Sequence, residues 1–176
     1  MEIDKPKEKM KQEIKEIFQN VNEWLKFAEA KHAGLIVLNS GLIFGILSIY
    51  KDYKTIIDWH LILVIIIVIG ISIILSLISL FPITKNETKN KQVNVTPNLY
   101  FFGSLSKLSE IELKSELLKS NPNYQFDRFE EDLINQIVVN AIIATRKYKL
   151  FKFAIWFTTV GLVLPVITLI IKLIWH

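Results

Sequence analysis

Residues able to carry out chemistry are few and scattered in this chain of 176 residues. The three histidines stand alone, and none has the spacing to carboxylates that a metal site requires. No serine lies in a nucleophile elbow, and no glycine-rich loop could hold a phosphate. The chain has no cysteine, which excludes disulfides, thiolate catalysis and cysteine-ligated zinc. We therefore expect no enzyme, no metal and no cofactor.

Charged side chains offer another kind of chemistry, the binding of anions. Arg128, Arg146 and Lys147 are the cations best able to hold an anion near the helical part of the chain. As solvated helix surface they need no explanation; as a site they would attract a lipid or nucleotide phosphate. The acidic run Glu130–Asp132 begins a predicted helix, where it complements the helix dipole. Only two of the 21 basic residues are Arg, so we expect no binding of a nucleic-acid polymer.

Three uncharged stretches must position these residues. The strongest is 61–81, whose twenty-one residues would extend roughly 30 Å as a helix, the thickness of a bilayer's hydrocarbon core. Residues 33–50 are eighteen uncharged residues, just enough to span, and residues 153–171 form a third candidate. The short connection between the first two makes them antiparallel neighbours. The sequence therefore predicts an all-α membrane protein with three transmembrane helices.

Polar and small residues within these spans indicate how the helices pack. Asn39 needs a hydrogen-bond partner at its depth, either on a neighbouring helix or along a polar path. Gly41 and Gly45 are four residues apart and permit close helix approach. Pro165 is expected to kink the third span, with threonines bonding the freed backbone groups. The threonines available for this are Thr158, Thr159 and Thr168. In the second span, a small and mildly polar stripe for packing is expected from Ser72, Ser76 and Ser79.

The charged segments predict a small cytoplasmic helical bundle. Residues 1–32 contain an amphipathic helix, from Lys11, whose apolar stripe we expect to pack against other helices rather than lie on the membrane. In the insertion 83–151 we expect a short strand at 91–95, a helix from Pro97 to about Lys119, and a second helix start at Asn121–Pro122. No Gly or Pro separates this last helix from the third span, so the two are predicted to be continuous.

The distribution of Lys and Arg predicts the orientation. Residues 1–32 hold seven of these cations and residues 83–152 hold eleven, whereas 51–60 and 172–176 together hold three. The positive-inside rule then places the N-terminus and the insertion in the cytoplasm and the C-terminus outside. We expect a multi-pass protein of the bacterial inner membrane.

Three phrases in a fixed order carry a resemblance to a known family. They are EWLKFAEAKHAGLIVLNSG at 23–41, NLYFFGSLSKLS at 98–109 and QIVVNAIIATRKYKLFKFAIWF at 136–157. Their order and spacing relative to the spans resemble the transmembrane effectors of Pycsar antiphage defence, over roughly residues 18–170. The residues that fall on the family's phrases are Phe27, Ala28, Glu29, Lys31, Phe101, Phe102, Gly103, Gln136, Asn140, Lys147 and Tyr148. Glu29 stands where Asp is usual, and His32 where a small residue is usual.

The resemblance implies an effector of abortive infection. A partner cyclase would make a cyclic pyrimidine mononucleotide, cyclic CMP or cyclic UMP, and the effector would respond by impairing the inner membrane. The implied partners are the lipid bilayer, this cyclic nucleotide and further copies of the chain in a homo-oligomer. The residues that we expect to bind the ligand or couple the two parts of the chain are Glu29, Lys31, Phe102, Arg128, Gln136, Asn140, Arg146, Lys147 and Tyr148. Interhelical hydrogen bonding that merely holds the bundle is the competing interpretation for each.

Three other functions remain open on the sequence. A membrane effector of a neighbouring defence class would respond to cyclic oligonucleotides and would need a larger basic pocket. A scaffold protein would recruit partners without permeabilising the membrane. A holin-like pore former would rarely devote so much chain to a cytoplasmic bundle.

Overall fold

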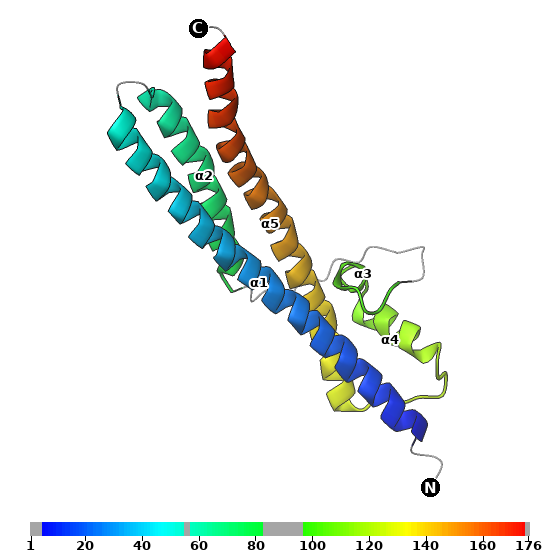
Figure 1. The fold of residues 1–176 in the computed structure, drawn as a ribbon. Helices are drawn as coiled ribbons and strands as arrows, with labels where there is room; N and C mark the ends of the chain where they lie inside the picture. Colours follow the sequence, from blue (N-terminus) through cyan, green and yellow to red (C-terminus); the bar gives the residue numbers. More distant parts are fainter. Residues whose placement is uncertain (1–4, 55–56, 83–96, 175–176) are drawn as a thin grey trace. The chain divides into compact units, whose positions relative to one another are not determined.

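The computed structural model describes residues 5–54, 57–82 and 97–174 (Figure 1). Those residues form helices without a strand, which confirms the all-α class. The helices are α1 (Lys5–Tyr53), α2 (Trp59–Leu80), α3 (Phe102–Leu105), α4 (Glu110–Leu118) and α5 (Arg128–Ile174). Helices α1 and α5 are exceptionally long, at 49 and 47 residues. The strand predicted at 91–95 lies outside the described residues.

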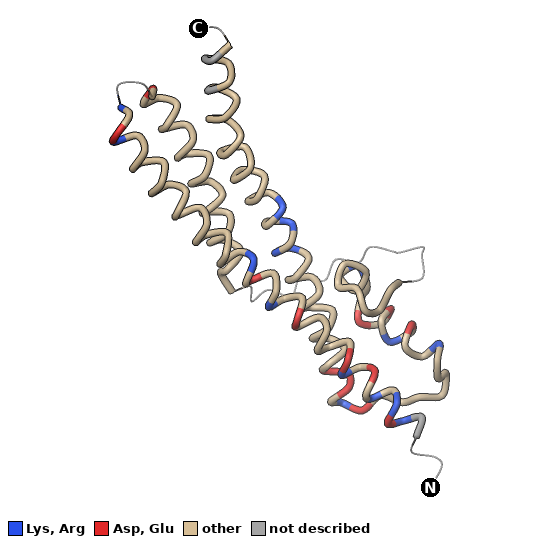
Figure 2. The backbone as a smooth tube through the Cα atoms, in the orientation of Figure 1, with Lys and Arg blue, Asp and Glu red and all other residues tan. Residues whose placement is uncertain are grey.

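The chain divides into two compact units. The first, here called the charged unit, comprises residues 1–28 and 83–147; the second, the membrane unit, comprises residues 29–82 and 148–176. Figure 2 shows that α2 carries no Lys, Arg, Asp or Glu, while α4 and the first turns of α5 are rich in both signs. Helices α1, α2 and α5 are each long and apolar enough to cross a membrane. The prediction of three spans, the third continuous with a preceding long helix, is confirmed.

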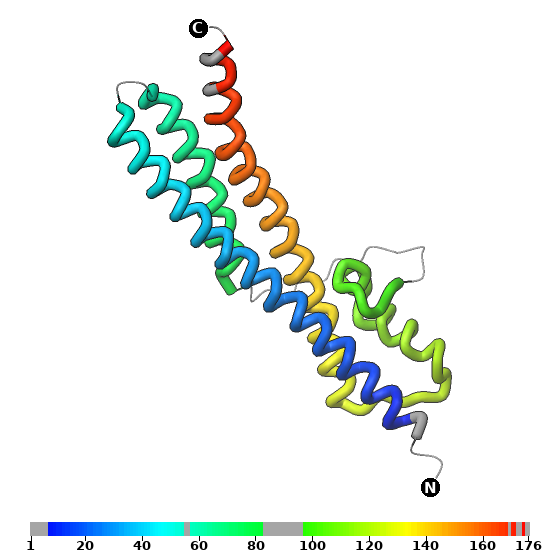
Figure 3. Tube along the Cα trace, in the orientation of Figure 1, coloured from blue at the N-terminus to red at the C-terminus, as the bar shows by residue number. Residues whose placement is uncertain are grey.

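In the charged unit, α1 and α5 run parallel (Figure 3). Lys11 pairs with Asp127 near the start of α5, and further along, Asn22 bonds Asn140, 118 residues later in the chain. The apolar stripe of α1 is buried, so its predicted packing inside the protein is confirmed. Its buried members are Met10, Ile14, Ile17, Val21 and Ala28, which meet a core that includes Leu105, Leu113, Leu117, Ile134 and Ile137. The helix begins at Lys5 rather than at the predicted Lys11.

The single helix predicted from Pro97 to about Lys119 is wrong, because two short helices occupy that stretch. Helix α3 ends at Leu105, and α4 starts after Ser109. The Ser109 hydroxyl accepts the Glu112 backbone N–H at 3.2 Å, and the Glu112 carboxylate accepts the Ser109 N–H at 2.7 Å. The Ser109 backbone bond lowers the pKa of Glu112. This reciprocal cap gives the backbone a favourable place to begin a new helix, which the apolar periodicity alone did not reveal.

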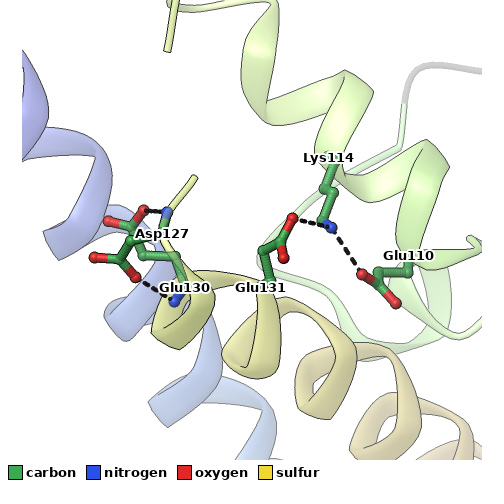
Figure 4. Close-up of polar contacts among 5 residues, drawn as sticks. All are labelled: Glu110, Lys114, Asp127, Glu130 and Glu131. Atoms are coloured by element: carbon green, nitrogen blue, oxygen red, sulfur yellow. Dashed lines mark hydrogen bonds and ion pairs between the residues drawn. The ribbon is translucent and has the colours of Figure 1, made fainter. Parts of the chain in front are cut away.

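The last helix begins at Arg128, which corrects the start predicted at Asn121–Pro122. Figure 4 shows the reason: the Glu130 N–H donates to Asp127 at 2.8 Å, and the Asp127 N–H donates to the Glu130 carboxylate at 2.9 Å. Tyr124 donates its hydroxyl to the same carboxylate at 2.6 Å. Burial, followed by this bond, raises the pKa of Tyr124. The buried Glu130 is therefore a structural cap, as its position at a helix start predicted.

A second set of charges ties α4 to α5 in the charged unit. Figure 4 shows Lys114 between Glu110 and Glu131, at 2.8 Å and 2.9 Å from their carboxylate oxygens. The two hydrogen bonds raise the pKa of Lys114. All three groups are partly exposed, so water weakens the pairs and their contribution is small. The buried cap at Glu130 fixes the start of α5 more firmly.

In the membrane unit, α2 runs antiparallel to α1 and α5. Near the α1–α2 connection, the rings of Tyr50 and Trp59 lie 5.2 Å apart. Helices α5 and α2 lie close together at Gly161, where an added methyl group would stand 2.7 Å from Ile69 Cγ1. A methyl group added at Gly41 or Gly45 would meet no atom of another helix within 4 Å among the described residues. Close approach within the chain therefore uses Gly161, and the predicted glycine pair faces outward.

Pro165 lies inside α5, which continues without interruption to Ile174. Thr168 donates to the carbonyls of Leu164 and Pro165, at 3.1 Å and 2.9 Å. Proline frees the carbonyl four residues earlier, that of Gly161, and none of the bonds found among the described threonines reaches it. The expectation that these threonines satisfy the freed group is therefore wrong, because a helical threonine reaches carbonyls three or four residues before itself.

We predict that Glu130→Ala frays the start of α5. The substitution removes the carboxylate that caps Asp127 and accepts the Tyr124 hydroxyl, at a cost of about 1–2 kcal/mol. Hydrogen exchange should accelerate at the backbone amides of the first turns of α5. Asp132→Ala, an exposed neighbour, is the matched control; equal acceleration in both variants would contradict the structural role of Glu130.

Candidate functional site

The membrane unit holds a closed ring of hydrogen bonds that joins its three helices. Asn39 donates from Nδ2 to Ser72 Oγ at 2.9 Å, and Thr158 donates from Oγ1 to Asn39 Oδ1 at 3.0 Å. The hydroxyls of Ser72 and Thr158 are 2.9 Å apart. If Ser72 donates across this gap, each side chain both donates and accepts once. All three are buried, so the prediction that Asn39 bonds a neighbouring helix is confirmed.

The ring lies on a longer buried stripe of α2. The buried residues of this helix are Ile62, Ile65, Ile69, Ser72, Ser76 and Ser79. The predicted packing of the three serines is therefore confirmed. The Ser76 hydroxyl is fully buried and has no hydrogen-bond partner among the described residues. A buried polar group within a span costs free energy, so this stripe is a candidate functional feature.

An aromatic and cationic cluster lies where the membrane unit begins on α1 and α5. The Lys31 ammonium stands 5.3 Å from the ring centroid of Tyr148 and 5.5 Å from that of Phe151. Both distances allow cation–π attraction. The buried His32 ring meets Phe151 edge to face, at 5.4 Å and 89°. Two predicted candidates, Lys31 and Tyr148, are thus brought together, and Glu29 lies exposed two residues before Lys31.

In the charged unit, Phe102 belongs to an aromatic cluster. Its buried ring lies 5.4 Å from Trp24 and 4.9 Å from Phe101. Tyr100 and Phe101 are exposed beside it. Burial, with smaller contributions from the carboxylates of Glu13 and Glu16, raises the pKa of Tyr100. The carboxylates of Glu13 and Glu16 would repel a phosphate, so this aromatic cluster is a poor binding site for one.

The predicted cations do not form one site. Arg128 and Arg146 are exposed on α5 eighteen residues apart, roughly 27 Å at 1.5 Å per residue. A mononucleotide could contact only one of them at a time. Gln136 is exposed between them, and Asn140 donates from Nδ2 to Asn22 at 2.8 Å. Lys147 is buried, with only 4% of its surface exposed.

The nine predicted residues therefore fall into separate places. Glu29, Lys31 and Tyr148 belong to the membrane unit, and the other six belong to the charged unit. Sequence reasoning missed Thr158 as a member of the buried ring, and it missed Gly161. The sequence did contain a signal for both residues, because a threonine and a glycine stand three residues apart in an apolar run. Among the described residues, no group of three or more His, Asp or Glu side chains could hold a metal ion.

We predict that Thr158→Val loosens the membrane unit. Valine keeps the shape of threonine but leaves Asn39 Oδ1 without its donor, a loss of roughly 0.6–1.7 kcal/mol for a bond between membrane helices. The thermal midpoint of the protein in detergent should fall. The adjacent Thr159→Val is the control, because Thr159 is exposed and bonds the Ile155 carbonyl of its own helix. A midpoint lowered equally by both substitutions would show that the ring contributes nothing.

Comparison with known proteins gives one informative match. The family model described as the Pycsar effector protein domain matches residues 13–174, nearly the whole chain. No curated protein and no solved structure matches significantly. The matched range covers most of both units and contains every residue that carried the resemblance in the sequence. The chain therefore belongs to the family of Pycsar antiphage effectors, as a multi-pass membrane member.

Proposed function

We propose that this protein is the membrane effector of a Pycsar antiphage system, activated by a cyclic pyrimidine mononucleotide. A partner cyclase would make cyclic CMP or cyclic UMP on infection, and the effector would then impair inner-membrane integrity and cause abortive infection. The observation that carries this proposal is the family match over residues 13–174 of a chain with three candidate spans. In this proposal the protein acts without catalysis and without a cofactor.

The continuity of α1 and α5 supports a direct coupling between signal and membrane. Each helix contributes its first part to the charged unit and its last part to the membrane unit. A ligand that shifts these helices in the charged unit would act on the spans through the same two helices. The junction residues Glu29, Lys31 and Lys147 are our candidates for carrying this coupling.

The ligand needs little positive charge in its binding site, because a cyclic mononucleotide carries a single negative charge on its phosphate. A single cation suffices, and Arg128 and Arg146 are too far apart on α5 to share it. We place the nucleotide in the charged unit, with Arg146 and Gln136 on the exposed face of α5 as its candidate contacts. The distribution of Lys and Arg supports a cytoplasmic N-terminus, which would put this unit on the side where the cyclase acts.

We predict that Glu29→Ala and Lys147→Ala reduce depolarisation in cells that express the protein with its cyclase. A coupling residue typically changes such an equilibrium by about 0.5–2 kcal/mol, which corresponds to a loss of about two- to thirtyfold. Membrane potential is read with a voltage-sensitive dye. Lys149→Ala, an exposed cation nearby, should behave as wild type. Normal depolarisation by both variants, with folding and insertion unchanged, contradicts the coupling.

A change of signal tests the ligand class in the same cells. A cyclase that makes a cyclic trinucleotide should leave the membrane polarised. Depolarisation by that signal would favour the neighbouring class of effectors, and unchanged potential under every signal would favour a scaffold.

We further propose that copies of the chain associate through the outward face of α1. Gly41→Leu and Gly45→Leu should weaken self-association in bilayers, measured by energy transfer between labelled chains, because bulky side chains prevent close helix approach. Each chain should still fold, since a methyl group at either site meets no atom within 4 Å among the described residues. Gly70→Leu on α2 is the control, because a methyl group there also meets no atom within 4 Å among the described residues. Energy transfer that stays unchanged in the α1 variants rules out this face.

A further inference from the structure

The buried stripe of α2 changes character halfway along the helix. Ser72, Ser76 and Ser79 lie toward the end of the membrane unit where α2 finishes, here called the proximal end. Ile62, Ile65 and Ile69 occupy the half toward the α1–α2 connection, here called the distal end. The change falls between Ile69 and Ser72, within one turn. One half of this stripe on α2 is therefore polar, and the other half is entirely aliphatic.

The other two helices contribute polar side chains at one level, and four residues before it their buried side chains are the apolar Leu35 and Ala154. Asn39 and Thr158 face Ser72 at the last polar level before the change. One turn toward the proximal end, the Ser76 hydroxyl is buried and unbonded among the described residues. Burying a hydroxyl without a partner costs free energy, and an alanine would pack there at no such cost. Small size alone therefore does not explain the choice of serine.

The distal half is sealed by close contact. Gly161 lets α5 approach so nearly that a methyl group there would stand 2.7 Å from Ile69 Cγ1. Ile65 and Ile69 are completely or almost completely buried. Aliphatic constrictions of this kind stop conduction in channels because water does not wet them. The serine half of the stripe offers hydroxyls with which water can bond, whereas the isoleucine half offers none.

We propose that the buried face of α2 is a path for water and protons, with Ser72, Ser76 and Ser79 as its lining and the Ile69–Gly161 contact as its gate. The inference rests on the proposed function and specifies how the membrane is impaired. When the helices separate slightly, a single file of water enters along the serines. Each water or hydroxyl accepts a proton on one side and releases another on the other, so no group is consumed. The path carries protons and excludes larger solutes.

The test uses the full chain in vesicles that contain a trapped pH-sensitive dye, with no nucleotide added. Ile69→Ser, alone and combined with Ile65→Ser, continues the polar stripe through the barrier and should raise proton influx by about tenfold or more. Ile67→Ser is the matched control, because Ile67 lies on the same helix with 53% of its surface exposed. The trapped dye should remain inside. Equal influx in control and test variants, or none in either, overturns the proposed path.

A second measurement tests the path even if the barrier variants fail to insert into the membrane. The chain has no cysteine, so Ser76→Cys introduces a single thiol in an otherwise unchanged protein. Silver ions, which are small and travel through water, should react with this thiol about tenfold faster than with the thiol of Ile74→Cys. Ile74 is close to Ser76 along α2 but has 57% of its surface exposed on the outer face. Equal rates would show that water does not reach the stripe.

These outcomes are separate from those of the proposed function. If cells with the cyclase stay polarised, the signalling proposal fails, whereas the vesicle measurements require no signal. If the wild-type protein depolarises cells but Ile69→Ser and Ser76→Cys behave as their controls, the effector acts on the membrane by another route.

Discussion

The membrane unit depends on one closed ring of side-chain hydrogen bonds, formed by Asn39, Ser72 and Thr158. Apolar helices in lipid gain little from burying more apolar surface, so their register must come from shape and from directional bonds. The ring supplies three such bonds at a single level, one between each pair of helices. About one turn further along, Gly161 allows α5 to pack closely against Ile69 of α2. With that register fixed, the three serines of α2 face the interior together with Ile62, Ile65 and Ile69.

In the charged unit the corresponding constraint is the start of α5. The buried Glu130 carboxylate accepts bonds from Tyr124 and Asp127, and it thereby fixes where a helix of 47 residues begins. Because α5 then runs without interruption, its start also determines which of its faces meets α1. Asn140 consequently reaches Asn22, and the apolar stripes of both helices enter one core.

Long-range periodicity made most of this fold predictable. Uninterrupted apolar stretches identified the three spans, and the three- and four-residue spacing from Ile14 to Ala28 identified the buried face of α1. The errors arose where a few polar atoms outweigh that periodicity: the cap at Ser109 divides one expected helix, and the cap at Asp127 moves the start of another. The site was less predictable, because the roles of Gly41 and Gly161 depend on which helix face meets a neighbour. No simple pattern in the sequence shows which face of a helix meets a neighbouring helix.

Each compact unit is assembled from an early and a late portion of the chain. The charged unit needs residues 1–28 and then the first part of α5, and the membrane unit needs residues 29–82 and then the last part of α5. During synthesis, neither core can close until the final helix has emerged, and contacts of such long sequence separation form late. An interrupted chain that lacks α5 therefore completes neither the charged unit nor the membrane unit. A ribosome that stalls before α5 is made therefore releases a fragment in which the core of neither unit is complete.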